Sequence, residues 1–81
     1  QARMRKLSSR LKKAEERIAE LETAIAQIDE ECADPANATN SAKLNELAAK
    51  QEAYRSELET CYETWEEVSM ELERQDARME E

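Results

Sequence analysis

The residues best suited to chemistry in this sequence are cationic side chains near its beginning. Six of them occur before any acidic residue: Arg3, Arg5, Lys6, Arg10, Lys12 and Lys13. Arg5 and Lys12 lie seven residues apart, as do Lys6 and Lys13, so a helix would arrange them as a short basic stripe. Closely spaced lysines and arginines are typical of contacts to nucleic-acid phosphates. We predict that these six residues form any nucleic-acid-binding site in the chain.

A second interpretation of the basic stripe is intramolecular. All 20 acidic residues follow it, and the chain carries a net charge of −8. Five of them belong to the stretch expected to lie opposite the stripe: Glu66, Glu67, Glu71, Glu73 and Asp76. The stripe would then balance an acidic neighbour. The acidic body would repel nucleic acid, which confines any contact to the stripe or to the near-neutral segment 37–41.

The chain lacks residue types on which catalysis and metal binding commonly depend. The chain has no His and no Gly, so it offers neither an imidazole base nor a glycine-rich phosphate loop. Cys32 and Cys61 fall at seam positions of predicted helices, where we expect both to be small apolar core residues. They are separated by about 20 Å of helix, too far for a disulfide or a shared metal ion. We predict no catalytic, cofactor-binding or metal-binding residue, so the chain itself is not an enzyme.

The apolar residues of the chain determine how the cationic side chains are positioned. They recur alternately three and four residues apart. One series is Met4, Leu7, Leu11, Ala14, Ile18, Leu21, Ile25, Ile28 and Cys32, and the other is Leu44, Leu47, Gln51, Tyr54, Leu58, Cys61, Trp65, Val68, Leu72, Gln75 and Met79. This spacing is the a/d seam of a coiled coil. Between the series, Pro35 interrupts a helix and Asn40 can cap the next one.

These features predict an all-α fold, an antiparallel two-helix coiled coil or helical hairpin. A single domain 1–81 would contain a helix over 3–33, a loop over 34–40 and a helix over 41–79. Of two possible registers, one places Ala14 opposite Trp65 and the other places Leu7 opposite Trp65. The first conserves volume across the layer, with Trp65 in the core. Opposite charges would then lie near each other in the pairs Arg10–Glu71, Glu31–Lys50 and Glu22–Arg55.

Two helices cannot enclose their seam from every side. We therefore expect the chain to form a weak homodimer, which would assemble as a four-helix bundle.

Gln1 is an unusual first residue, so we expect a fragment of a larger protein. No apolar run approaches the roughly 20 residues of a membrane span, and two thiols suit a reducing compartment. We predict a cytoplasmic protein with no membrane partner.

Several short motifs occur in order along the chain. They are Arg17-Ile18-Ala19-Glu20-Leu21-Glu22, Ala33-Asp34-Pro35, Lys43-Leu44-Asn45-Glu46-Leu47, Glu57-Leu58-Glu59, and Tyr62-Glu63-x-Trp65-Glu66-Glu67. Through these motifs, residues 14–73 resemble the C-terminal coiled-coil extension of ABC-F ATPases, which are ATP-binding cassette proteins with two nucleotide-binding domains and no membrane part. Lys6-Leu7-Ser8 is similar to a motif that often opens this extension.

The resemblance implies a parent protein that binds ATP and Mg²⁺, hydrolyses ATP and acts on ribosomes. It also implies that the extension is a non-catalytic accessory domain contributing to nucleic-acid or ribosome recognition, with the parent's ATPase domains as further partners. No ATP-binding motif of the family falls within this chain. The alternative is a structural coiled coil that mediates dimerisation or packs on the parent's ATPase domains.

Overall fold

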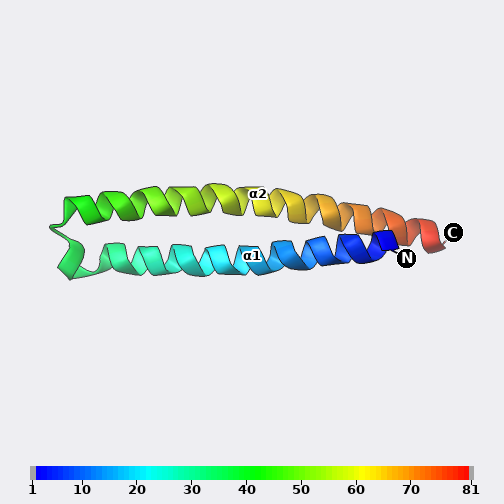
Figure 1. Cartoon of the computed structure of the whole chain (residues 1–81), viewed down its shortest axis with the longest axis horizontal. Helices are drawn as coiled ribbons and strands as arrows, with labels where there is room; N and C mark the ends of the chain where they lie inside the picture. Colours follow the sequence, from blue (N-terminus) through cyan, green and yellow to red (C-terminus); the bar gives the residue numbers. More distant parts are fainter. Residues whose placement is uncertain (1, 81) are drawn as a thin grey trace.

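The chain forms two long helices joined by a short loop. The computed structural model describes residues 2–80, with helix α1 at Ala2–Ala33, a 3-10 turn η1 at Pro35–Asn37, and helix α2 at Ser41–Glu80. The helices run side by side in opposite directions, so both termini lie at one end and the loop lies at the other (Figure 1). The molecule measures 63 × 16 × 14 Å.

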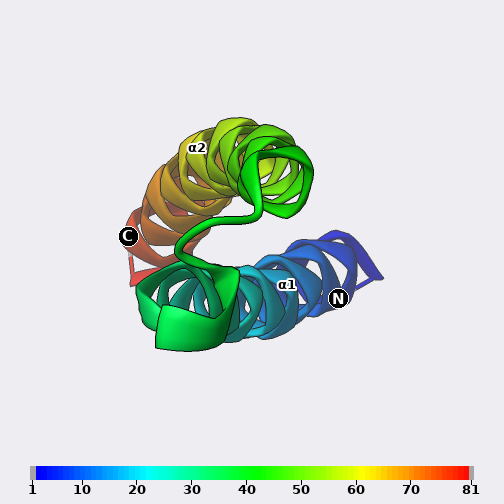
Figure 2. The same cartoon turned by 90° about the vertical axis from the view of Figure 1, so that its left-hand side faces the viewer.

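The view from the loop end shows that α1 and α2 wind around each other (Figure 2). This winding follows from the heptad pattern, because a seam that repeats every 3.5 residues drifts around a helix of 3.6 residues per turn. The described residues contain helices and turns but no strand. The predicted all-α helical hairpin is therefore confirmed.

The loop is held by hydrogen bonds from its own polar side chains. The Asp34 carboxylate accepts from the backbone N–H of Ala36 at 2.9 Å, and the Asn37 amide donates to the Glu31 carbonyl at 2.9 Å. The same Glu31 carbonyl also accepts from the backbone N–H of Asp34 at 3.2 Å, so the last turn of α1 is closed by two bonds. Pro35 has no N–H to continue the helix, so the chain turns at the predicted position.

Asn40 begins α2 as an N-cap. Its side-chain oxygen accepts a hydrogen bond from the backbone N–H of Lys43 at 3.1 Å, and its carbonyl accepts from the N–H of Leu44 at 3.0 Å. The predicted cap is confirmed. A cap of this kind stabilises the helix start because the first N–H groups have no partner within the helix.

Replacing Asn40 with alanine is expected to lower the free energy of unfolding by about 1 kcal/mol, since the cap bond to Lys43 is lost. Urea unfolding followed by circular dichroism measures the change. Asn45→Ala is the matched control, because Asn45 is exposed within α2 and alanine favours a helix interior. Equal losses in the two variants would show that the cap contributes nothing.

The buried core is one row of the seam. The buried side chains are Leu7, Ala14, Leu21, Ile28, Leu47 and Val68. All of them occupy the second position of the three–four repeat, the d position. The described a positions, such as Ile18 and Leu58, are half-buried or exposed. A helix with one neighbour can fully cover only the row that points directly at that neighbour.

Two predictions about the core are therefore wrong. Trp65 is 39% exposed rather than buried, because it occupies an a position on the open side of the seam. Cys32 is also exposed, at an a position in the last turn of α1 before the loop. Cys61 is at a d position and is half-buried, and both thiols are free.

The contacts between the helices agree with the register that places Ala14 opposite Trp65. The Tyr62 hydroxyl donates to the Glu22 carboxylate at 2.6 Å, and Ile18 and Trp65 line the same groove. The other register would shift Tyr62 along α1 by seven residues, or about 10 Å, which would separate it from Glu22. That register is excluded.

The predicted charge pairs are replaced by others. Glu71 accepts from Arg3 across the hairpin, Lys50 pairs with Glu46 within α2, and Glu22 accepts from Tyr62. The side-chain amide of Gln51 donates to the Asp29 carboxylate, a contact that agrees with the same register. Exposed pairs contribute little free energy, so they follow the register set by the core rather than determine it.

Candidate nucleic-acid interface

The six predicted contact residues lie on the first half of α1, at the end of the hairpin that carries both termini (Figure 1). All six are exposed: Arg3, Arg5, Lys6, Arg10, Lys12 and Lys13. The seven-residue spacing separates them into two sets. Arg3, Lys6, Arg10 and Lys13 follow the d side of the α1 seam, and Arg5 and Lys12 lie toward its a side.

Arg17 extends the larger set and was missed at the sequence level. Arg3, Lys6, Arg10, Lys13 and Arg17 are spaced alternately three and four residues apart, so they form one continuous row along α1. We call these five residues the cationic stripe. At 1.5 Å per residue the stripe is about 20 Å long. The repeat spacing was the signal that could have included Arg17.

Arg17 is held in place by carboxylates. Its Nε and Nη2 atoms donate to the two oxygens of Glu57 at 2.5 and 2.9 Å, and its Nη1 atom donates to Glu20 at 3.0 Å. The hydrogen bonds to Glu57, then that to Glu20, raise the pKa of Arg17, and the same contact lowers the pKa of Glu57. Such a bidentate pair orients the guanidinium and neutralises that end of the stripe.

Arg3 occupies a similar position at the other end of the stripe. Its Nη2 atom lies 3.3 Å from Glu71, which also pairs with Arg74. By contrast, Lys6, Arg10 and Lys13 form no ion pair with any residue that the structure describes. The intramolecular interpretation therefore applies to Arg3 and Arg17, and the middle of the stripe keeps its charge available.

A shallow groove of about 260 Å³ borders the middle of the stripe. Its lining consists of Arg10, Lys13, Ala14, Thr60, Cys61 and Thr64. Arg10 and Lys13 supply cations from α1, and Thr64 supplies a hydroxyl group from α2, whereas the Thr60 hydroxyl donates to the Ser56 carbonyl. Phosphate oxygens accept from Arg10, Lys13 and the Thr64 hydroxyl, so the groove can hold an anionic oxygen at the helix–helix boundary.

Thr64 explains why Arg10 has no carboxylate partner. Glu57, Thr64 and Glu71 are seven residues apart on α2, and Arg17, Arg10 and Arg3 are seven apart on α1. The outer two arginines pair with the outer two glutamates. The middle arginine instead shares a groove with a threonine. A neutral residue at position 64 thus leaves a gap in an otherwise regular ladder of ion pairs.

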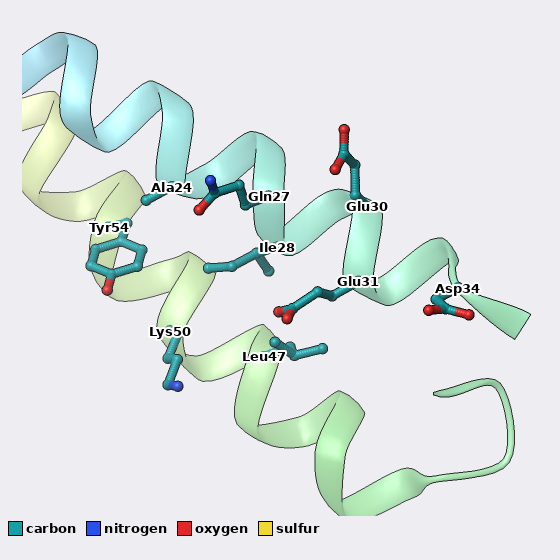
Figure 3. Close-up of a pocket in the computed structure, with 9 residues that line it drawn as sticks. All are labelled: Ala24, Gln27, Ile28, Glu30, Glu31, Asp34, Leu47, Lys50 and Tyr54. Atoms are coloured by element: carbon teal, nitrogen blue, oxygen red, sulfur yellow. The ribbon is translucent and has the colours of Figure 1, made fainter. Parts of the chain in front are cut away.

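The second possible contact, the segment 37–41 at the tip of the hairpin, lies next to a groove but lines no part of it. A groove of about 500 Å³ there is lined by Ala24, Gln27, Ile28, Glu30, Glu31, Asp34, Leu47, Lys50 and Tyr54. Glu31 reaches toward α2, whereas Glu30 points away from it (Figure 3). Three carboxylates against one lysine make this surface unsuitable for phosphate. No cluster of possible metal ligands occurs among the described residues.

A family model described as ABC transporter C-terminal domain matches residues 3–70. The chain belongs to this family. No curated protein and no solved structure matched it.

Membership makes the chain a C-terminal accessory domain of an ABC-type protein. A short hairpin of this kind fits a non-catalytic part of an ABC ATPase. Neither helix of this ABC transporter C-terminal domain, over the described residues, has a stretch long and apolar enough to cross a membrane. The sequence contains no glycine and therefore no glycine-rich phosphate loop.

Proposed function

We propose that this domain is the nucleic-acid-contacting arm of an ABC-F type protein, and that it meets ribosomal RNA or DNA through the cationic stripe. The ATP and Mg²⁺ of that protein would be bound by its cassette domains, and a ribosomal role would place it in the cytoplasm. Within this proposal the hairpin is a rigid arm, and the end that carries both termini contacts the nucleic acid.

The observation that carries the proposal is the row of unpaired cations in the middle of the stripe. Lys6, Arg10 and Lys13 are exposed, and Arg10 and Lys13 share a groove with Thr64, although the chain as a whole carries a net charge of −8. The protein has many carboxylates, yet these three cations form no ion pair with the described residues. Their arrangement therefore favours binding of an anion from another molecule. These three cations span seven residues of helix, or about 10 Å, so they can reach neighbouring phosphates of one strand.

The test is a salt titration of binding to duplex DNA and to structured RNA. With about three phosphate contacts, the logarithm of the affinity should fall with the logarithm of the salt concentration at a slope near −3 on duplex DNA. The double variant Lys6→Glu, Lys13→Glu should weaken binding by about tenfold or more at low salt, because two contacts become repulsive.

The matched control is Arg5→Glu, Lys12→Glu, which makes the same change of net charge on the other side of α1. It should weaken binding clearly less, since its residues lie outside the stripe. Equal losses would mean that only net charge matters and would remove the stripe as the contact surface. Absence of binding to both nucleic acids at low salt would reject the proposed function and favour a structural coiled coil.

A further inference from the structure

A second groove lies on the other edge of the hairpin, away from the cationic stripe. It has a volume of about 310 Å³ and is lined by Glu15, Ile18, Ala19, Glu22, Tyr62 and Trp65. Ile18 and Trp65 are a positions, which belong to the open row of the seam. This groove therefore exists because two helices cover only the d row.

Aromatic surface dominates the α2 side of the groove. Tyr62 is 47% exposed and Trp65 is 39% exposed, and they lie within one turn of each other. Opposite them, the short side chain of Ala19 leaves room beside the half-buried Ile18. Tryptophan and tyrosine in a partly desolvated pocket are the residues that most often carry binding energy at protein interfaces.

The rim of the groove is acidic. Glu15 and Glu22 line it from α1, and the Tyr62 hydroxyl donates to Glu22 at 2.6 Å. On α2, Glu59 and Glu66 stand three residues before and four residues after Tyr62, which places both beside it on the helix surface. Both are exposed, and no basic residue lines the groove.

We propose that this groove is a docking site for a basic amphipathic helix of another protein. The partner would insert an apolar side chain between Ile18 and Trp65, and its flanking lysines or arginines would meet the carboxylates of the rim. The homodimer expected from the open seam would not use this groove, because a second copy would bring one acidic rim against another. The proposal concerns the edge opposite the stripe, so it stands independently of nucleic-acid binding.

Trp65 is the single tryptophan of the chain, so its fluorescence reports on the groove directly. The probe is a model helical peptide of leucine and lysine with one apolar face. We expect its addition to shift the Trp65 emission to shorter wavelength in a saturable manner, because the ring loses contact with water. A peptide of the same design with glutamate in place of lysine should produce no such shift.

Two pairs of variants locate the contact. Glu15→Gln, Glu22→Gln should weaken peptide binding by about tenfold, since two rim charges are removed. Glu16→Gln, Glu30→Gln makes the same change of net charge at exposed positions outside this groove and should leave binding nearly unchanged. Ala19→Leu, which fills the groove at an exposed position, should also weaken binding.

Three outcomes would overturn the proposal. One is equal binding of the lysine and glutamate peptides, and another is equal weakening by both glutamine pairs. The third is a concentration-dependent dimer of the chain alone, seen by sedimentation velocity, that shifts the Trp65 emission in the same way. That result would assign the groove to a second copy of this chain.

Discussion

Leu21→Ala is expected to lower the free energy of unfolding by about 3 kcal/mol, within the roughly 2–5 kcal/mol measured for buried leucines in other proteins. Leu21 is 1% exposed, the most completely buried large side chain among the described residues. It occupies a d position near the middle of α1. Truncation leaves a cavity there, because two rigid helices cannot move together at one layer without disturbing the layers on either side.

The same loss of free energy should unfold a larger fraction of this protein than of a larger protein. A domain of this size has a modest free energy of unfolding, so about 3 kcal/mol is a large share of it. Urea unfolding followed by circular dichroism measures the loss as a lower midpoint. We expect the variant to be partly unfolded near body temperature, visible as reduced helical signal before any denaturant is added.

Leu11→Ala is the matched control. It removes the same atoms from the same helix, but Leu11 is an a position and only half-buried. Its loss should be less than half that of Leu21→Ala, since part of the side chain is already in contact with water. Similar losses for the two variants would contradict the conclusion that the d row alone forms the core.

The helical hairpin was predictable because each local signal agreed with the others. The three–four repeat determined the helices, Pro35 ended the first, and the Asn40 side chain began the second. The predicted register agrees with the Tyr62–Glu22 bond, although the volume argument behind it assumed that Trp65 is buried, and Trp65 lies at the open edge of the seam. Short-range patterns of this kind suffice when each helix has a single neighbour.

The difference between the two seam rows could not be predicted from the repeat. Periodicity treats a and d positions alike, whereas burial depends on how the two helices are rotated about their axes. That rotation leaves Ile18 and Trp65 at an open edge and encloses Ala14 and Leu21. The aromatic groove is therefore a property of the assembled hairpin.

The cationic stripe was predicted in part. The sequence identified Lys6, Arg10 and Lys13 as cations, but it could not say which of them would be neutralised across the hairpin. That outcome depends on which residue of α2 stands opposite each one. The register assigns Glu57 to Arg17 and Glu71 to Arg3, and it leaves a threonine beside Arg10.

The gap in this ladder leads to the prediction with the largest expected effect on binding. Thr64→Glu should weaken nucleic-acid binding by about tenfold or more at low salt, because the introduced carboxylate pairs with Arg10 and faces Lys13. The slope against salt should become less negative by about one for each cation that is neutralised. Binding curves on duplex DNA and structured RNA at several salt concentrations supply both quantities.

The folded structure should tolerate this substitution. Glutamate occurs at the equivalent α2 positions seven residues before and after Thr64, and both of those glutamates form ion pairs with α1. Glutamate also favours a helix more than threonine does. We therefore expect the urea midpoint to remain the same or to rise, so that a loss of binding cannot be attributed to unfolding.

Thr64→Gln separates charge from shape in this experiment. Glutamine has nearly the size of glutamate but cannot neutralise Arg10, so this variant should bind nucleic acid almost as well as the unchanged protein. If both variants lose binding equally, the Thr64 hydroxyl itself contacts the phosphate and the gap in the ladder is incidental. If neither loses binding, Arg10 is not a contact residue and the groove beside it has no part in holding phosphate.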